Sequence, residues 1–571
     1  MRKTKVVLAK VLTAAMVISS FAGVQGITSE AAAKPKLSKK SVSITVGKTK
    51  KITVKNAKKY KVSWKMKSKK IASFKKSGKY AVKVTAKKAG KTTLTATIKK
   101  GKKTKKLVCK ITVKKNSPKV TKTPVNTPTT SPSNVPKTTE VPTVKPTATA
   151  TAEPQDTTPA MKEIFKGVID NVGTCLTYNQ TWNNRKEMQD VSTMEFVDKN
   201  FNSFTLENEM KPDSMLNKHN MISVADAKAK GYVISDDYKE STVPELTLET
   251  IDGVLAIAKQ HNIRMRAHTL MWHQQTPTWF FKKNYDDEEA VVDEATMNAR
   301  LEFFVRTIMR HTMQKEKELT GEVGSIVYAW DVLNEYIHRS NAAAATTWVS
   351  VYGDMGLKPT YVKAAFEYAY DELKKENVQD KVTLFYNDYD TYFSVDDELA
   401  LISYINEGEK AKICGGIGMQ SHVDIKRPTL EEYGNALKAF INAGLEVQIT
   451  ELDITINFDT DETDGRTPTY AYKNEKETDA DQAAFTKDFI KQIVDIQKNL
   501  QKNRDKNKSP KGITGITVWG ISDQTSWRGS CKPLFFTRKN VRVKDETTGK
   551  YKTVYTYVPK KSYEAMIEAL K

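Results

Sequence analysis

Eight short apolar runs alternate with long helical patterns between residue 159 and residue 571. The runs have the length and β-branched content of buried strands, and they begin near Val172, Ser203, Ile263, Ile326, Val382, Gly415, Leu445 and Ile513. The clearest helical patterns between them cover residues 247–261, 299–316, 361–376, 429–443 and 481–499. Eight such alternations predict an α/β fold, a (β/α)8 TIM barrel with additional loop sequence.

Polar and aromatic side chains follow these runs at their carboxyl ends, where a barrel of this type carries its functional groups. Residues 325–335 end in Asn334 and Glu335, and residues 445–453 end in Glu451 and Asp453. Two strand-end glutamates far apart in the chain suit a hydrolase that works with a carboxylate pair. The other strand ends add amides, histidines and tryptophans, which bind sugar hydroxyls and the apolar faces of sugar rings. The pattern therefore predicts a sugar-cleaving site.

Five segments resemble glycoside hydrolase family 10, the endo-β-1,4-xylanases, in the family's order. They are Thr205-Leu-Glu-Asn-Glu-Met-Lys, His268-Thr-Leu-Met-Trp-His, Trp330-Asp-Val-Leu-Asn-Glu, Gly416-Ile-Gly-Met-Gln-Ser-His and Ile449-Thr-Glu-Leu-Asp-Ile. The resemblance implies retaining hydrolysis of xylan, with Glu335 as acid/base and Glu451 as nucleophile. It also implies that Asn334 binds a substrate 2-hydroxyl and that His422 orients Glu451 together with Asp453. The implied substrate-binding residues are Glu207, Asn208, Lys211, His268, Trp272, Gln275, Gln420, Trp519 and Trp527, with Tyr389 on the leaving-group side.

Two alternatives to a xylanase remain open on the sequence. A retaining β-glucanase acting on mixed-linkage glucan or cellulose would use the same carboxylate pair. A non-catalytic surface protein with a glycan-binding barrel is the other alternative, and the presence of both carboxylates argues against it. No metal or cofactor is predicted, because the histidines match no standard zinc spacing and the four cysteines are scattered along the chain.

The first 33 residues have the layout of a secretory signal peptide. Arg2, Lys3 and Lys5 precede an apolar stretch over residues 6–24, and residues 31–33 are three alanines that suit a cleavage site. Lys10 interrupts the apolar stretch, which is short for a membrane span. We therefore expect a secreted, extracellular protein with no transmembrane segment in its mature form.

Residues 34–115 contain 31 lysines and no Asp, Glu or Arg. Alternating polar and apolar runs separated by glycines predict a small antiparallel β-sandwich. Ser41-Val-Ser-Ile-Thr-Val-Gly-Lys-Thr and Val84-Thr-Ala-Lys-Lys-Ala-Gly-Lys-Thr resemble bacterial immunoglobulin-like domains of surface proteins.

The lysines of this segment have two interpretations. They form either a solvated face that keeps edge strands apart or a surface for an anionic polymer. Nucleic acid is not expected for a secreted segment that contains no Arg and only four aromatic residues. An anionic cell-wall polymer or an acid-substituted polysaccharide fits better, so association with a cell surface stays open.

Residues 116–158 consist mainly of Thr, Pro, Val and Ser, and we expect them to form an extended tether. The formal charge of the chain is +25, which is the sum of +35 over residues 1–158 and −10 over residues 159–571. The basicity is therefore confined to the N-terminal part. The predicted organisation is a signal peptide (1–33), a Lys-rich immunoglobulin-like β-sandwich (34–115), a linker (116–158) and a catalytic barrel (159–571).

Overall fold

The computed structural model describes residues 35–39, 41–46, 48–57, 60–100, 103–114, 158–180, 185–216, 219–339, 346–456, 477–503, 511–544 and 551–571. These residues form two compact units, one on each side of a boundary between residues 148 and 149. The predicted signal peptide, the linker up to residue 157 and the polar stretch 457–476 lie outside the described residues. Within the described ranges, no helix is both long enough and apolar enough to cross a membrane.

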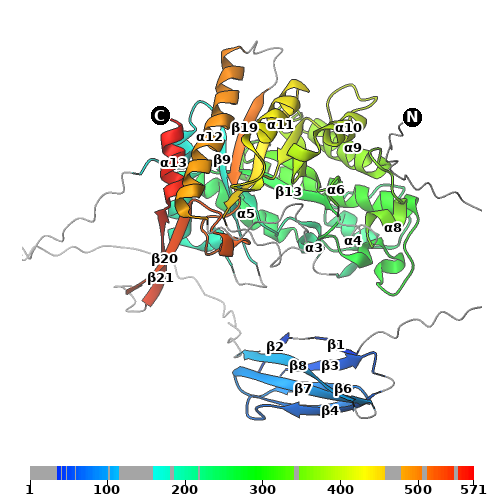
Figure 1. The fold of residues 1–571 in the computed structure, drawn as a ribbon. Helices are drawn as coiled ribbons and strands as arrows, with labels where there is room; N and C mark the ends of the chain where they lie inside the picture. Colours follow the sequence, from blue (N-terminus) through cyan, green and yellow to red (C-terminus); the bar gives the residue numbers. More distant parts are fainter. Residues whose placement is uncertain are drawn as a thin grey trace, which may run out of the picture. The chain divides into compact units, whose positions relative to one another are not determined.

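The first unit is a β-sandwich of two four-stranded sheets (Figure 1). One sheet has the order β1-β3-β6-β5, formed by Lys36–Leu37, Thr49–Lys55, Ala81–Ala86 and Ala72–Gly78. The other has the order β2-β8-β7-β4, formed by Ser41–Thr45, Lys103–Lys114, Gly90–Lys100 and Lys61–Met66. The predicted small all-β unit is confirmed, and its kinship with immunoglobulin-like domains stays a prediction.

One pairing in the sandwich differs from the fully antiparallel prediction, because β2 runs parallel to β8. The chain crosses from one sheet to the other after β1, so that an early strand joins the last strand at a sheet edge. Local alternation of polar and apolar residues predicts strands, but it does not reveal a partner 69 residues away. Inward-facing side chains such as Ile52, Leu94 and Ile111 form the core between the sheets.

The second unit contains a closed barrel of eight parallel strands, as predicted. The strands are β9 (Asn171–Leu176), β10 (Ser203–Leu206), β13 (Arg264–Trp272), β14 (Val327–Asn334), β15 (Thr383–Asp388), β16 (Gly416–Met419), β18 (Glu446–Thr455) and β19 (Gly512–Val518). Each pairs with the next in chain order, β19 pairs with β9, and this last pairing closes the barrel. The short β17 (His422–Asp424) lies parallel to the end of β18.

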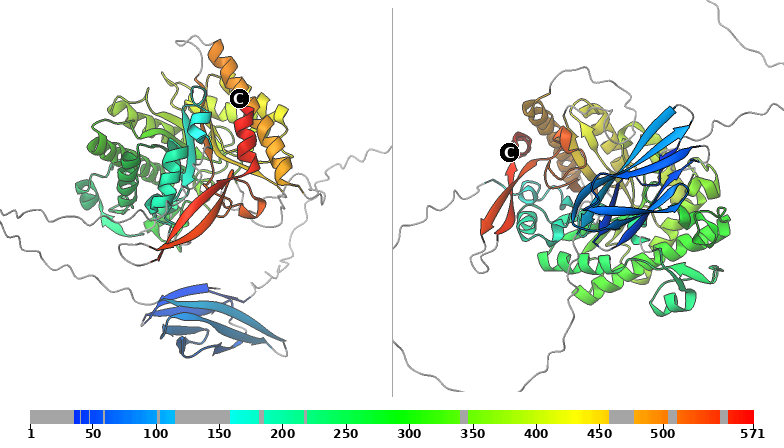
Figure 2. Two further views of the ribbon diagram at one scale, coloured as in Figure 1. Left: turned by 90° about the vertical axis from the view of Figure 1, so that its left-hand side faces the viewer. Right: turned by 90° about the horizontal axis from the view of Figure 1, so that it is seen from below.

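Helices surround the barrel in the order that the alternating pattern predicts (Figures 1 and 2). They are α1 (Met161–Ile164), α2 (Val191–Asn200), α3 (Pro212–Met215), α4 (Val224–Ala229), α5 (Glu249–His261), α6 (Glu294–Thr320), α8 (Trp348–Tyr352), α9 (Thr360–Lys375), α10 (Val395–Ile405), α11 (Leu430–Asn442), α12 (Asp479–Lys502) and α13 (Lys561–Ala569). Helix α6 is longer than predicted because Asp293 caps its first turn and Gly321 ends it in a left-handed conformation.

Two segments outside the eight strand–helix units form additional strand pairs. After α3, a small antiparallel pair forms between β11 (Met221–Ser223) and β12 (Thr242–Pro244). Near the C-terminus, β20 (Phe536–Lys544) and β21 (Tyr551–Pro559) form an antiparallel hairpin, which projects from the barrel (Figures 1 and 2). All four cysteines are buried and free.

Irregular pairing lies at the carboxyl ends of the strands that carry the predicted site. The register shifts between His268 and Met271 on β13, between Asp331 and Leu333 on β14, and between Ile449 and Leu452 on β18. A bulge bends its strand and changes the direction of the side chains that follow it. The bulges therefore determine which polar groups at these strand ends point into the mouth of the barrel.

Candidate active site

Glu335 follows directly after β14 and has an unusual backbone. Its φ angle is +56°, a left-handed conformation that non-glycine residues rarely adopt. The backbone N–H of Glu335 donates to the carbonyl oxygen of Asn387 at 2.9 Å, which ties this turn to the end of β15. A strained conformation held by a neighbouring strand is typical of a functional site.

The carboxylate of Glu335 is buried and surrounded by hydrogen-bond donors. Trp272 Nε1 donates to Oε2 at 2.9 Å, Gln274 Nε2 donates to the same oxygen at 3.4 Å, and Gln420 Nε2 donates to Oε1 at 3.1 Å. These donors come from the end of β13, from the segment after it and from the residue that follows β16. They fix the carboxyl group in one orientation at the mouth of the barrel.

Glu451 lies on β18 and is held as a carboxylate. Asn387 Nδ2 donates to Oε1 at 2.9 Å, and His422 Nε2 lies 3.2 Å from Oε2. Burial raises the pKa of Glu451, but the His422 hydrogen bond and the nearby imidazole and ammonium groups outweigh burial and lower its pKa to about 2. A buried carboxylate that stays ionised is suited to nucleophilic attack.

His422 is placed between two carboxylates. Its Nδ1 lies 2.9 Å from Asp453 Oδ2, and Trp527 Nε1 donates to the same oxygen at 2.9 Å. Burial lowers the pKa of His422, but the charges and hydrogen bonds of Asp453 and Glu451 raise it by more, so that its pKa lies above the usual value. A protonated His422 can donate to both carboxylates at once.

The imidazolium of His422 leads to a prediction about the pH dependence of catalysis. In His422→Gln, burial becomes the main influence on Glu451, so its pKa should rise from about 2 toward or above the usual value. Glu451 must be ionised to attack, so the acidic limb of the kcat/KM profile should move upward by at least about one pH unit. Profiles from pH 3 to 8 would measure this. His261→Gln, outside the site, should leave the limb in place, and an unmoved limb in His422→Gln would contradict the role of the imidazolium.

A chain of amide side chains connects the two glutamates. Gln420 Nε2 donates to Glu335 and also to Asn334 Oδ1 at 3.3 Å, and Asn387 Nδ2 donates to Asn334 Oδ1 at 2.9 Å and to Glu451. Both bonds to Asn334 use its amide oxygen, so its amide nitrogen is the group that it can offer to a substrate hydroxyl. The network holds Glu335 and Glu451 in a fixed relation across the barrel.

Two residues that donate hydrogen bonds to the glutamates, Asn387 and Gln274, were not among the predicted site residues. Asn387 lies in the polar end of β15, beside Asp388, and Thr450 Oγ1 donates to its amide oxygen at 2.6 Å, which fixes the orientation of the amide. Gln274 lies between the predicted Trp272 and Gln275. The polar end of β15 was the signal for Asn387, while the sequence held no signal that separated Gln274 from its neighbour.

The predicted residues line one cavity of about 230 Å³ at the carboxyl end of the barrel. Its walls combine carboxylates, amides, imidazoles and indoles, the side chains that suit a sugar site. The lining residues are Glu207, Asn208, Lys211, His268, Trp272, Gln274, Gln275, Asn334, Glu335, Gln420, His422, Glu451, Trp519 and Trp527. Except for Gln274, all of them were predicted from the sequence.

Polar groups outside the cavity hold its walls in position. Asp331 accepts from His268 Nδ1 at 2.9 Å and from Arg266 Nε at 3.1 Å. These bonds fix the orientation of the His268 ring. Arg185 Nη1, which sequence reasoning missed, donates to Glu207 Oε2 at 2.6 Å. Because these partners lie outside the contiguous motifs, only the folded chain reveals them.

Two predicted residues lie beside the cavity instead of lining it. Asp453 acts through His422, as described above. The hydroxyl group of Tyr389 donates to the carbonyl oxygen of His338 at 2.8 Å, and the two rings lie 4.7 Å apart. A contact of Tyr389 with the leaving-group side of a substrate stays a prediction.

Two carboxylates that meet in a polar, tryptophan-lined cleft at the carboxyl end of a (β/α)8 barrel define a barrel glycoside hydrolase. The comparisons with known proteins agree with this class. The sequence pattern of glycosyl hydrolase family 10 matches residues 160–555. The chain belongs to this family.

The relatives are xylan-degrading enzymes by name. Endo-1,4-β-xylanase A of Butyrivibrio fibrisolvens is 39% identical over 356 residues, which cover 62% of this chain and 76% of that protein. Endo-1,4-β-xylanase B of the same organism is 32% identical over 344 residues, which cover 59% of this chain but only 46% of that protein. Among solved structures, the CBM22-1–GH10 modules of the N-terminal endo-1,4-β-D-xylanase 10B of Clostridium thermocellum, complexed with xylohexaose, align with a TM-score of 0.50 at 26% identity. That alignment covers 72% of this chain and 68% of that one.

Proposed function

We propose that the protein is an endo-1,4-β-xylanase that cleaves xylan with retention of configuration. The observation that carries this proposal is the hydrogen-bonded connection between Glu335 and Glu451 through Gln420, Asn334 and Asn387. Retaining glycosidases use one carboxylate as nucleophile and a second carboxyl group as acid and then base. The names of the relatives support xylan as the substrate.

The proposed reaction has two steps. Glu451 attacks the anomeric carbon of the sugar at the cleavage point, and Glu335 transfers its proton to the departing oxygen, which leaves a glycosyl ester on Glu451. In the second step, Glu335 removes a proton from water as the water oxygen attacks the same carbon and releases Glu451. The ester carries no negative charge, so its formation lowers the electrostatic cost of ionising Glu335 and allows the change from acid to base.

The remaining cavity residues are assigned to substrate binding. The amide nitrogen of Asn334 is assigned to the 2-hydroxyl, where a hydrogen bond that strengthens in the transition state would accelerate the reaction. Trp519 and Trp527 offer ring faces to the sugars, and Glu207, Asn208 and Lys211 offer polar groups on the non-reducing side. Retaining β-glucanase activity is the alternative within the same reaction class.

A comparison of substrates tests this proposal. The full chain should release reducing sugar from xylan much faster than from mixed-linkage β-glucan or cellulose, and its first products should keep the β configuration by proton NMR. A higher rate on β-glucan would overturn the assignment of xylan as the substrate. Binding of xylan without release of sugar would favour a non-catalytic protein.

We also propose that the Lys-rich sandwich binds an anionic polymer such as a cell-wall polymer or an acid-substituted polysaccharide. Lys51 on β3, Lys83 on β6 and Lys75 on β5 are exposed and lie directly opposite one another across three neighbouring strands. Like charges opposite each other destabilise a sheet, and residues 34–115 contain no acidic side chain to offset them. An anionic ligand would relieve this repulsion.

Co-sedimentation of the full chain with purified cell wall tests this second proposal. Binding at low salt should fall at high salt and should be weakened by a triple Lys→Gln variant at positions 51, 75 and 83. A triple variant with the same charge loss at Lys36, Lys69 and Lys88 is the control and should bind better. Equal binding by both variants, or no binding at low salt, would count against the row of lysines as the ligand surface.

The proposed compartment is extracellular, with residues 1–33 removed during secretion. The charged beginning, the apolar stretch and the small residues before residue 34 support this proposal. N-terminal sequencing of protein from the culture medium should give a chain that begins at or near Lys34. A chain that begins at Met1, or protein found only inside cells, would rule it out.

A further inference from the structure

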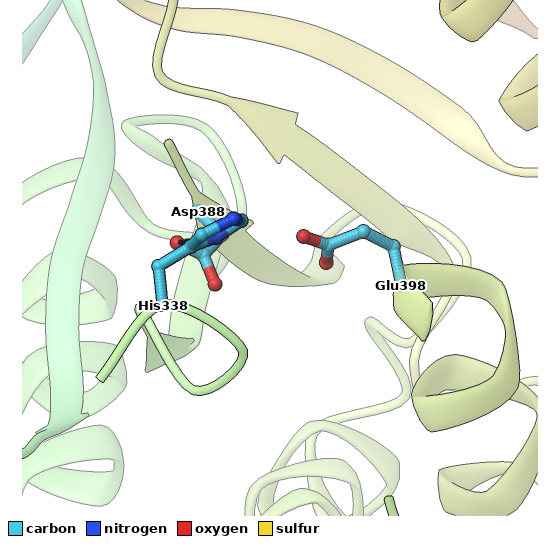
Figure 3. A group of neighbouring side chains, drawn as sticks. All are labelled: His338, Asp388 and Glu398. Atoms are coloured by element: carbon cyan, nitrogen blue, oxygen red, sulfur yellow. Dashed lines mark hydrogen bonds and ion pairs between the residues drawn. The ribbon is translucent and has the colours of Figure 1, made fainter. Parts of the chain in front are cut away.

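Three buried or half-buried side chains converge behind the segment that carries Glu335. His338 lies three residues after Glu335, Asp388 ends β15, and Glu398 lies in the first turn of α10 (Figure 3). One possible ligand atom of each side chain lies within 4.8 Å of those of the other two. Asp388 and Glu398 are completely buried, whereas the His338 side chain is 21% exposed. The cluster lies outside the cavity that binds substrate in the proposed reaction.

The carboxylate of Asp388 is the centre of this cluster. Its Oδ1 accepts from the Tyr389 backbone N–H at 2.8 Å and pairs with His338 Nδ1 at 3.2 Å. Its Oδ2 accepts from the Ile337 backbone N–H at 3.2 Å and from the Tyr386 hydroxyl. A cation could therefore bind Asp388 only in place of one of these donors, and His338 is the one whose nitrogen can itself become a ligand.

Glu398 supplies the second, independent observation. Ser394 Oγ donates to its Oε1 at 3.1 Å, but its Oε2 is completely buried and has no hydrogen-bond partner. In Figure 3 the carboxyl group of Glu398 points toward Asp388 and His338. An unpaired buried carboxylate oxygen is costly, so it is expected to have a ligand or a proton.

We propose that His338, Asp388 and Glu398 hold a divalent transition-metal ion such as Zn²⁺. One imidazole and two carboxylates are a common ligand set for such ions, and a water molecule on the exposed side of His338 would complete a tetrahedral site. Ligand atoms about 2.1 Å from a metal in a tetrahedral site lie about 3.4 Å apart, so side-chain rotations that bring the three atoms up to about 1.4 Å closer together would form the site. The ion takes the place of the proton between His338 and Asp388, which passes to the solvent.

The ion would have a structural role next to the catalytic residues. It would join the segment after β14 to the end of β15 and the beginning of α10, which follow about 50 to 60 residues later in the sequence. The same region is held by the Ile337 N–H on Asp388 and by the Tyr389 hydroxyl on the His338 carbonyl. Metal binding should therefore stabilise the turn that positions Glu335.

A proton on Glu398 is the competing occupant. Burial, followed by the negative charge of Asp388, raises the pKa of Glu398 well above its usual value. Glu398→Gln imitates this protonated state, because the amide oxygen can accept from Ser394 and the amide nitrogen replaces the unpaired oxygen. The variant should fold as the wild-type protein does without metal, and it should lose the metal ligand.

The test measures zinc binding and thermal stability of the full chain. After treatment with a chelator and dialysis against Zn²⁺, the wild-type chain should retain one ion that Glu398→Gln and His338→Gln do not retain. Saturating Zn²⁺ should raise its Tm by about 3 °C or more, whereas Ca²⁺, which prefers oxygen ligands, should have little effect. His311→Gln removes another histidine paired with an aspartate and serves as the matched control, which should keep the zinc response.

Two results would overturn the proposal. If the wild-type chain retains no zinc, Glu398 holds a proton instead. If all the variants retain zinc and the same Tm shift, the ion binds elsewhere. Should Glu398→Gln fail to fold by circular dichroism, His338→Gln decides between these outcomes, because its amide can still donate to Asp388 without binding zinc.

Discussion

Replacement of Glu451 by alanine should lower kcat on xylan by about 10⁴-fold or more. The variant lacks the only group assigned to attack the anomeric carbon, so the glycosyl ester cannot form. The network around it supports this large effect, because Asn387, His422 and through it Asp453 all orient this one carboxylate. Reducing-sugar release and isothermal titration with a xylo-oligosaccharide would separate loss of chemistry from loss of binding.

A matched control lies on the same strand. Glu446 is at the opposite end of β18, where it accepts from Lys511 Nζ at 2.9 Å and is remote from the cleft. Glu446→Ala removes the same number of atoms from β18 and should lower stability without a comparable loss of kcat. Substantial activity in Glu451→Ala, or an equal loss in both variants, would contradict the assignment of Glu451 as nucleophile.

The architecture of the barrel could be predicted because each strand can be recognised from its own local sequence. Runs such as residues 513–518 are almost entirely buried, which a mainly apolar, β-branched sequence reveals. The functional groups could also be located, because all strands are parallel and their carboxyl ends meet at one face. The parallel pairing of β2 with β8 was missed for the opposite reason, since it depends on a contact between distant segments.

The details of the site that could not be predicted from the sequence depend on irregular strand pairing and irregular backbone conformation. The bulges in β13, β14 and β18 change which side chains face the barrel mouth, so simple alternation does not show that Asn387 contacts both Asn334 and Glu451. The left-handed backbone of Glu335 depends on the Asn387 carbonyl in the same way. A sequence motif identifies the residues of a site, whereas bonds between motifs determine their geometry.

Replacement of Glu335 by glutamine should lower kcat on xylan by about 10² to 10⁴-fold, which is less than the effect at Glu451. Glutamine has nearly the same shape and can still accept from Trp272, so the cleft should keep its structure. The amide cannot donate a proton to the departing oxygen or accept one from water. Both steps therefore slow, and initial rates on xylan measure the combined loss.

The choice of leaving group separates the two roles of Glu335. An aryl xyloside with an acidic phenol as leaving group needs little proton transfer in the first step, so Glu335→Gln should form the glycosyl ester quickly and then hydrolyse it slowly. A burst of phenol followed by a slow steady rate is the expected result, and added azide should speed the second step because it attacks without a base. A variant equally slow with both kinds of substrate, and unaffected by azide, would mean that Glu335 acts by positioning the substrate. The amide network predicts the first result, because the hydrogen bonds from Asn387 to Asn334 and Glu451 do not involve residue 335 and should hold Glu451 in place in Glu335→Gln.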